Sequence, residues 1–260
     1  MLSVAVGDIC GSIYELRGYG TKNYEEVNLL RDDTDYTDDT ICAFACAEAL
    51  LKGIDVGKNL WERCQPEIKR GFGNRFRQWL MDENRTPYVS QGTNGSAMRC
   101  MAAGFLARNE EECKEMAFRI AEPTHNHPDS IRGAEAIAMG IYYTLRGKDK
   151  DFIRQHVLDV YYPDWSGMKY SEIVPDLPFS CLCNDTVPLA LICYLESNSF
   201  EQCLKMCIGN GSDSDTIAAM AAPMAYIHYG SMPEELIRLA ESKLPGWMQE
   251  VNRQISERVQ

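Results

Sequence analysis

Apolar residues recur along this chain at intervals of three and four positions, the spacing that places side chains on one face of an α-helix. The alternation of apolar and polar residues that is typical of a half-buried strand is hard to find. Glycine follows several of the periodic segments and marks where a helix would end. The pattern predicts helices over residues 2–14, 39–52, 97–108, 110–121, 130–146, 187–197, 200–208, 216–229 and 233–244.

These helices predict an all-α protein. Several of them are rich in alanine, methionine and cysteine on every side, which is typical of central helices surrounded by other helices. Residues 162–185, with four prolines within or beside them, form the longest segment without helical spacing. A length of 260 residues and a hydrophobic content of 45% suit one compact domain, and no repeat or linker divides the chain. We therefore expect a single domain over residues 1–260.

The charge of the chain excludes some classes of partner. The formal net charge is -12 at pH 7, whereas proteins that bind nucleic acid strongly need clustered lysine and arginine, so we expect no such binding. Residues 1–11 are apolar, but they are short, contain Asp8 and have no lysine or arginine. We expect neither a signal peptide nor a membrane segment, and we expect the protein to be cytoplasmic.

The cysteines predict little chemistry. There are eleven, an odd number in a long chain, and no two are spaced as Cys-x-x-Cys. This differs from the disulfide framework of a small secreted protein. Buried thiols pack like small apolar residues. We expect reduced thiols and no thiolate metal site.

Two acidic clusters occur at the starts of predicted helices. The sequence Thr-Asp-Asp-Thr occupies residues 37–40, and Asp-Ser-Asp-Thr occupies residues 213–216. Asp and Thr are common N-caps, and the helix dipole favours carboxylates there, so capping alone explains either cluster taken singly. A cap needs one oxygen, however, whereas each cluster supplies two carboxylates and two hydroxyls. The excess points to a further role.

A shared pocket would give the clusters that role. Like charges about 4 Å apart repel by roughly 4 kcal/mol at an effective dielectric constant of 20, and bound cations would cancel this repulsion. Carboxylate and hydroxyl oxygens are hard ligands that prefer Mg²⁺ or Mn²⁺ to zinc. Spacing along the chain leaves open whether the two clusters meet.

A polar stripe lies on the first predicted helix. Asp8, Ser12 and Glu15 are at positions i, i+4 and i+7 and so share one face of an otherwise apolar segment. One interpretation is an amphipathic helix that shows this face to water. The other is a pocket wall, because the face is narrow and because Gly7 and Gly11 each cost about 1 kcal/mol of helix stability. Those glycines suggest that another group approaches the backbone closely.

Two further segments contain polar residues at a turn or loop. Residues 92–99 form a glycine-rich turn that enters a helix, where free N–H groups can bind phosphate, although a turn with a serine cap would look the same. Residues 124–128 contain His125 and His127. A His-x-His pair can bind metal, but no third histidine is nearby, so we expect a polar loop in which at most one ring contacts a ligand.

Five motifs thus occur in a fixed order between residues 7 and 218. They are Gly7-Asp8-Ile9-Cys10-Gly11-Ser12-Ile13-Tyr14-Glu15, Tyr36-Thr37-Asp38-Asp39-Thr40, Asn94-Gly95-Ser96-Ala97-Met98-Arg99, Thr124-His125-Asn126-His127-Pro128 and Asp213-Ser214-Asp215-Thr216-Ile217-Ala218. This ordered set resembles the ADP-ribosylglycohydrolase family and extends over most of the chain.

The resemblance implies an orthogonal all-α fold with two Mg²⁺ or Mn²⁺ ions at the bottom of a cleft. It assigns the metal ligands to Thr37, Asp38, Asp39, Asp213, Asp215 and Thr216. It places the diphosphate against a loop formed by Asn94, Gly95 and Ser96, and it makes His125 a residue that lines the ligand cleft. Glu15 is the first candidate for catalysis and Asp39 the second.

The resemblance also implies a hydrolase that cleaves the N- or O-glycosidic bond at ribose C1″ of an ADP-ribosylated protein or small molecule and releases ADP-ribose. Such a reaction passes through an oxocarbenium-like state and needs a placed ribose, an activated water and a protonated leaving group. Two metal ions could anchor the ribose and activate water, while Glu15 or Asp39 exchanges the proton. The leaving group would meet residues 19–36 and 162–183, whose sequences leave its identity open, and the oligomeric state is equally open.

Two alternatives differ in class. An isoprenoid-synthase type of enzyme also holds Mg²⁺ with aspartates, and Asp35, Asp38 and Asp39 imitate its first motif, but residues 184–185 run into Pro188 and supply no second one. A catalytically inactive, ADP-ribose-binding or crystallin-like relative would have lost metal ligands, and none is lost here. Departures from the family pattern at residues 93 and 209–212 affect loop shape and leave every ligand position filled.

Overall fold

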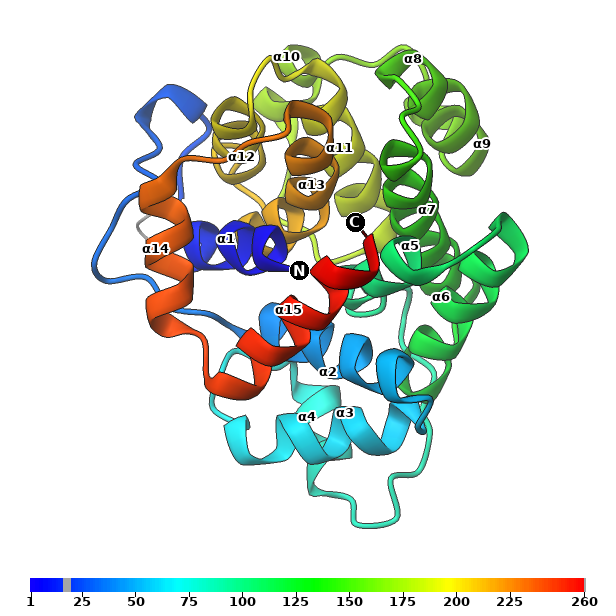
Figure 1. Ribbon diagram of the computed structural model, residues 1–260. Coiled ribbons are helices and arrows are strands. Elements are labelled where there is room, and N and C mark those ends of the chain that lie inside the picture. The colour runs from blue at the N-terminus through cyan, green and yellow to red at the C-terminus, as the bar shows by residue number, and fades with distance from the viewer. Residues whose placement is uncertain (16–19, 260) are drawn as a thin grey trace.

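Helices are the dominant secondary structure in this protein, for which a computed structural model describes residues 1–15 and 20–259 (Figure 1). Within those residues no strand occurs, and Thr93 and Leu182 form an isolated antiparallel bridge. The all-α prediction is therefore confirmed. The α-helices are α1 (Leu2–Gly11), α2 (Asp38–Lys52), α3 (Val56–Cys64), α4 (Asn74–Met81), α5 (Met101–Leu106), α6 (Glu110–His125), α7 (Pro128–Leu145), α8 (Lys150–Ile153), α9 (Asp159–Tyr161), α10 (Tyr170–Ile173), α11 (Cys183–Glu196), α12 (Phe200–Ile208), α13 (Ser214–Tyr229), α14 (Glu234–Lys243) and α15 (Gly246–Val259).

Shorter helical turns connect these helices. They are the 3-10 turns η1 (Tyr24–Glu26), η2 (Gln65–Glu67), η3 (Ala97–Arg99), η5 (Pro163–Trp165) and η6 (Val174–Asp176), and the π-helical turn η4 (Arg154–Leu158). None of the described helices combines the length and the apolarity that crossing a membrane requires.

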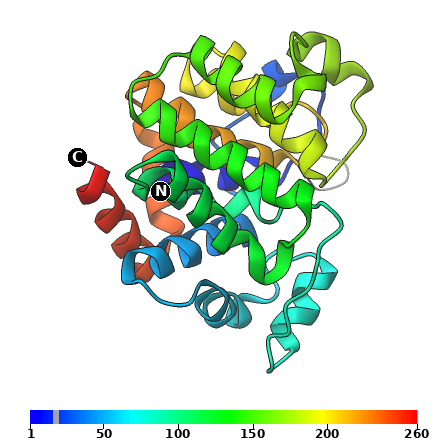
Figure 2. The same cartoon turned by 90° about the vertical axis from the view of Figure 1, so that its right-hand side faces the viewer.

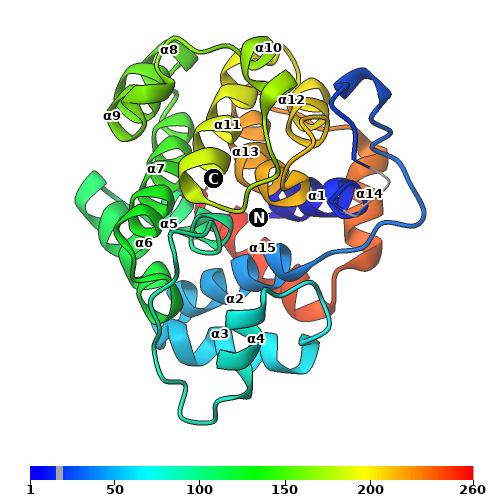
Figure 3. The same cartoon turned by 180° about the vertical axis from the view of Figure 1, so that it is seen from behind.

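Two helices form the centre of the fold. Helix α13 packs against α1, α7, α11 and α12, and every residue from 214 to 225 is buried. Helix α2 packs against α3, α5 and α15 and buries every residue from 39 to 49. Seen from behind, α13 and α1 lie above α2, and the loop that precedes α5 lies between them (Figure 3). The prediction that the helices rich in alanine, methionine and cysteine are central is confirmed.

Several predicted boundaries differ from the structure. The first helix ends at Gly11 rather than at residue 14, and residues 97–108 form η3 and α5 rather than one helix. Residues 162–185, predicted to be irregular, contain η5, α10, η6 and the start of α11. Proline lies in the first turn of both η5 and η6, where its missing N–H breaks no helical hydrogen bond.

The one-turn helices α8, α9 and α10 were not predicted, and neither were three longer helices, namely α3, α4 and α15. Each lies on the outside of the fold and buries only one narrow side; in α3 the buried residues include Val56, Leu60 and Cys64, at i, i+4 and i+8. Figure 2 shows α4 and the segment that follows it projecting at one edge of the molecule. Such polar helices carry a weak periodic signal, because packing rather than composition stabilises them.

A buried ion pair ties α2 to α3. The Glu48 side chain is 5% exposed, and its carboxylate accepts hydrogen bonds from Arg63 Nε at 2.7 Å, from Lys52 Nζ at 2.6 Å and from Asn59 Nδ2 at 3.1 Å. The Arg63 guanidinium also lies 4.4 Å from the ring centre of Trp247 in α15. Burial alone would raise the pKa of Glu48, but the hydrogen bonds from Arg63, Lys52 and Asn59 outweigh it and lower the pKa to about 2.

This pair should make stability depend on pH in acid. Because the folded pKa of Glu48 is lower than the unfolded one, the stabilisation is complete above about pH 4.5 and is lost as the pH falls toward about 2. We expect Glu48→Gln to reduce the unfolding free energy at about pH 6 by roughly 2–3 kcal/mol, and the difference from the unchanged protein to shrink in acid. Urea titrations of both proteins at several pH values measure this difference in unfolding free energy. A difference that is equal at about pH 6 and about pH 3 would contradict the role of this pair.

Candidate functional site

Two glycines let α1 lie directly against α13. A Cβ atom added at Gly7 would lie 2.5 Å from the carbonyl oxygen of Ala218, and one added at Gly11 would lie 2.4 Å from the Cα of Asp215. Real Cβ atoms do not approach backbone so closely, so only glycine fits at these positions. The expectation that another backbone approaches this face of the first helix is confirmed. The contact brings the carboxyl end of α1 beside the amino end of α13.

Asp8 connects α1 to the start of α2. Its side chain is fully buried, so the polar stripe does not face water at this position. The carboxylate accepts hydrogen bonds from the N–H of Thr37 at 2.9 Å and of Thr40 at 3.1 Å, and from the hydroxyl groups of both residues. Burial nevertheless raises the pKa of Asp8. Asp8 therefore fixes the amino end of α2 against α1.

The two acidic clusters meet. Oxygens of Asp8, Asp39 and Asp215 lie within 4.8 Å of one another, and so do oxygens of Glu15, Asp213 and Asp215. Asp215 belongs to both groups and connects them. Carboxylates from α1, α2 and α13 thus form two adjoining sets of oxygen ligands, which is an arrangement that suits a pair of hard divalent cations sharing one ligand.

The electrostatics of the cluster fit bound cations. Burial and the charges of neighbouring carboxylates raise the pKa of Asp39 and of Asp215 well above the ordinary range. Asp39 is 3% exposed, and its Oδ1 atom is buried without a hydrogen-bond partner. Burying an unpartnered carboxylate oxygen is costly, and a cation would satisfy it. The residues present therefore fit Mg²⁺ or Mn²⁺.

The remaining predicted metal ligands surround these groups. Thr37 is the N-cap of α2, and Thr216 is buried in the first turn of α13, where its N–H donates to Asp215 Oδ1 at 2.8 Å. Asp38 lies apart from both three-residue groups of carboxylates, beside Gly71, where an added Cβ would be 2.8 Å from Asp38 Oδ1. Burial and the charge of Asp8 raise the pKa of Asp38 well above its usual range. Its assignment as a ligand stays a prediction.

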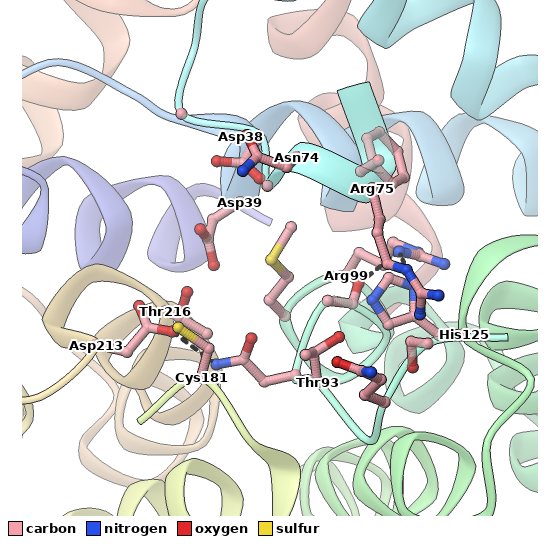
Figure 4. Close-up of a pocket in the computed structure, with 18 of the residues that line it drawn as sticks. Asp38, Asp39, Asn74, Arg75, Thr93, Arg99, His125, Cys181, Asp213 and Thr216 are labelled. Atoms are coloured by element: carbon pink, nitrogen blue, oxygen red, sulfur yellow. Dashed lines mark hydrogen bonds between the residues drawn. The ribbon is translucent and has the colours of Figure 1, made fainter. Parts of the chain in front are cut away.

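A cavity of about 380 Å³ opens onto the cluster. Figure 4 shows Asp38, Asp39 and Asp213 at one end of it, and Asp215 and Glu15 also line it. The Glu15 side chain is exposed, unlike those of Asp213 and Asp215 in its group. Partial burial and the charges of Asp213 and Asp8 raise the pKa of Glu15 to about 7. Glu15 is thus the carboxylate in this cluster that solvent reaches most easily.

The other end of the cavity is basic and aromatic. Figure 4 shows Arg75, Arg99 and His125 across the cavity from Asp213, and Tyr88 also lines it. The fully buried Arg99 guanidinium donates hydrogen bonds to the carbonyl oxygens of Gly95 at 2.6 Å and Ile120 at 2.9 Å. Burial and the Arg99 charge lower the pKa of His125 well below its usual value, so this ring is neutral. The cavity therefore runs from negative to positive charge.

The predicted phosphate loop borders the cavity only in part. Asn94 and Gly95 line it, and an added Cβ at Gly95 would be 2.5 Å from Nε2 of His125, so the glycine lets the ring pack against the loop. Asn94 Nδ2 donates to Asp213 Oδ2 at 2.8 Å and thereby positions a predicted metal ligand. Ser96 is fully buried, and its hydroxyl donates to the carbonyl oxygen of Ser130 at 2.7 Å, behind the cavity wall. Contact of these residues with a ligand stays a prediction.

Three residues at this site were absent from the predicted ligand set. The sequence did mark Asp8, because this residue begins the polar stripe on the first predicted helix. Arg99 ends a motif but resembles an ordinary surface arginine in sequence. Cys181 lines the cavity, and nothing in the sequence distinguishes it from ten other cysteines.

The fold and the site define an all-helical protein with a cluster of carboxylates, suited to divalent cations, at one end of a cleft. Over residues 1–260 the chain matches the sequence pattern of the ADP-ribosylglycohydrolase family. The chain therefore belongs to the ADP-ribosylglycohydrolase family, and the resemblance noted in its motifs is confirmed.

Individual relatives agree with this assignment. The chain is 24% identical over 257 residues to the ADP-ribosyl-[dinitrogen reductase] glycohydrolase of Rhodospirillum rubrum, covering 88% of this chain and 84% of that protein. It is 24% identical over 300 residues to the ADP-ribosylhydrolase ARH3 of Bos taurus, covering 86% and 82%. A solved ADP-ribosylglycohydrolase-related protein complex matches the fold with a TM-score of 0.79 at 21% identity, covering 100% of this chain and 96% of the other.

Proposed function

We propose that this protein hydrolyses the glycosidic bond at ribose C1″ of an ADP-ribosylated substrate and releases ADP-ribose, with two Mg²⁺ or Mn²⁺ ions as cofactors. The observation that carries the proposal is the meeting of two carboxylate groups through Asp215 inside the cavity. Membership of the family supports hydrolysis of ADP-ribosyl linkages in general.

The charge distribution of the cavity supports ADP-ribose as the ligand. Its diphosphate is anionic and would be favoured near Arg75 and Arg99, while the adenine could pack against Tyr88 and His125. The ribose to be cleaved would then lie at the acidic end, near Glu15. This orientation places the bond to be broken beside the carboxylates.

Carboxylates of the protein itself can transfer the proton that the reaction requires. Cations bound at the centre would supply Lewis-acid catalysis and hold the ribose hydroxyl groups. Glu15 lies within 4.8 Å of Asp213 and Asp215 and is open to the cavity, so it is placed to exchange a proton with a water or with the leaving group. Asp39, whose Oδ1 has no partner, is the second candidate.

We propose that two loops, which pack on each other, meet the leaving group. Lys22 Nζ donates to the carbonyl oxygens of Pro175 at 3.0 Å and Leu177 at 2.8 Å, so the segments 20–36 and 162–182 pack on each other. The Tyr24 and Tyr170 rings also meet edge to face, 5.9 Å apart. Tyr19, the first residue of the predicted substrate-contacting segment, lies outside the described residues. We propose that these loops select the linkage that is cleaved.

A panel of substrates tests the activity. Arginine-linked, serine-linked, nucleic-acid-linked and small-molecule ADP-ribose would be incubated with the protein and Mg²⁺ or Mn²⁺, and free ADP-ribose would be measured. We expect release from at least one class, abolished by EDTA and by Asp39→Ala but retained by Glu234→Ala, whose carboxylate is exposed and pairs with Arg238. If the whole panel fails although ADP-ribose and Mg²⁺ raise the melting temperature, the protein is a binder and the hydrolase proposal is wrong.

A further inference from the structure

A second cavity, of about 450 Å³, shares Tyr88 with the first as part of its wall. It is formed by the start of α3, the loop that follows α4 and the end of α6, and this loop lies at the projecting edge of the molecule (Figure 2). None of the described residues that line it belongs to the acidic cluster. His125 lines the first cavity and Asn126, the next residue, lines the second. The two cavities are therefore neighbours with separate linings.

Flat, largely apolar side chains line part of the second cavity. Trp79 is 4% exposed, and the ring of Phe76 packs on it with the ring centres 5.2 Å apart, so the indole is held in place. Pro87 and Tyr88 also line the cavity. The Nε1 atom of Trp79 is buried without a hydrogen-bond partner. A buried donor of this kind is costly, and an acceptor on a bound heteroaromatic ring would satisfy it. These groups suit a flat ring such as a nucleobase.

Arg85 brings an unpaired positive charge to the same cavity. Its guanidinium lies 6.0 Å from the ring centre of Trp61, and within the described part of the chain no carboxylate pairs with it. Among those residues Arg85 is also the one non-glycine residue with a positive φ, of 52°, which is unfavourable for a residue with a side chain. The carboxylate of Asp82 holds the turn by accepting hydrogen bonds from the N–H groups of Asn84 at 3.0 Å and Thr86 at 2.9 Å. The loop thus keeps a cation at the cavity despite the cost to its backbone.

The remaining charged groups are of both signs. Lys58 adds a second positive charge, and Asp55 and Glu122 add two carboxylates. Asp55 Oδ1 already accepts the N–H of Lys58 at 2.6 Å as the N-cap of α3. Cations of this kind bind phosphate, and carboxylates accept hydrogen bonds from hydroxyl groups. A nucleoside phosphate carries a flat base, ribose hydroxyl groups and an anionic phosphate, so it matches all three kinds of group.

We propose that the second cavity binds a nucleoside phosphate, at a site separate from the one proposed for ADP-ribose. The base packs against Trp79 and Tyr88, and the phosphate pairs with Arg85 and Lys58. Because Tyr88 lines both cavities, a ligand in the second one contacts a side chain that also borders the first. The proposal goes beyond hydrolysis and would stand even if the protein cleaved no ADP-ribosyl bond.

Calorimetric titration with AMP and with adenosine tests the phosphate end of the site. We expect Arg85→Gly to weaken AMP binding at least about tenfold, as loss of a hydrogen bond to a charged group does, and to leave adenosine binding unchanged. Glycine readily adopts a positive φ, so this variant should melt close to the unchanged protein. Arg258→Ala, which removes an exposed arginine from the last turn of α15, should bind AMP normally. AMP that fails to bind, AMP binding that Arg85→Gly leaves intact, or an equal loss for adenosine would overturn the proposal.

A photoreactive azido-AMP locates the site without mutation. Trypsin cleaves after lysine and arginine and would release peptides 53–58 and 78–85, which contain residues that line the second cavity and none that line the first. After irradiation we expect mass spectrometry to find the label on one or both of these peptides. Label confined to other peptides would show that AMP binds elsewhere and would contradict the site. No ADP-ribosylated substrate enters either experiment, so their outcome is separate from that of the hydrolase test.

Discussion

Gly11→Ala should destabilise the protein and weaken cation binding together. The added Cβ would lie 2.4 Å from the Cα of Asp215, and this neighbour is backbone, so α1 and α13 must move apart. Overpacking typically costs about 1–3 kcal/mol and can cost more. Alanine would otherwise favour the helix by about 1 kcal/mol. Because the clash involves two backbones, we expect a net loss of at least about 2 kcal/mol and a melting temperature about 4–8 °C lower.

The effect on the site follows from the same movement. Asp8 and Glu15 lie on α1 and the turn after it, and both must stay near Asp215 to complete the two carboxylate groups. Calorimetric titration with Mn²⁺, at a temperature where the variant is folded, should show weaker binding. Gly246→Ala is the matched control, because an added Cβ there meets nothing within 4 Å. If Gly11→Ala melts and binds Mn²⁺ like the unchanged protein, α1 does not position the site.

Asp215→Asn should have opposite effects on stability with and without cations. In the metal-free protein it removes one negative charge from a buried cluster of like charges, and we expect stabilisation of about 1–3 kcal/mol. With Mg²⁺ or Mn²⁺ present, the unchanged protein should gain about 2.7 kcal/mol when the cation is at a hundred times its dissociation constant, and the variant should gain little. The variant should therefore melt at a higher temperature than the unchanged protein without cations, and at a lower temperature than the unchanged protein with them.

The same substitution should abolish the proposed hydrolysis. Losing the ligand shared by both groups removes several kcal/mol of transition-state stabilisation, and each 1.4 kcal/mol corresponds to about tenfold in rate, so we expect a loss of at least about a thousandfold. Asp151→Asn removes an exposed carboxylate from α8 and should change neither the rate nor the response to cations. A variant at position 215 that hydrolyses normally would remove the basis for the two-cation centre.

Local sequence patterns determined the helices and the motifs. The helix at 200–208 has the predicted limits, and α2 ends at Lys52 with Gly53 as its left-handed cap, because periodicity and capping depend on residues a few positions apart. The polar helices α3, α4 and α15 escaped prediction because their stability comes from packing against distant parts of the chain. Gly7 and Gly11 in the first helix did predict a contact with a distant part of the chain, because only a closely packed neighbour explains glycine at these positions.

The sequence by itself determined which carboxylates cluster along the chain, and that hard cations suit them. Only the tertiary structure decided that residues 8, 39 and 215 share one centre. It also decided that Asp38 belongs to neither three-residue group of carboxylates, and that Ser96 is buried behind the cavity wall. It also decided that one thiol of eleven, Cys181, is exposed and lines the cavity. The physical reason is that a local pattern fixes which face of a helix is polar, whereas the packing of whole helices fixes what that face meets.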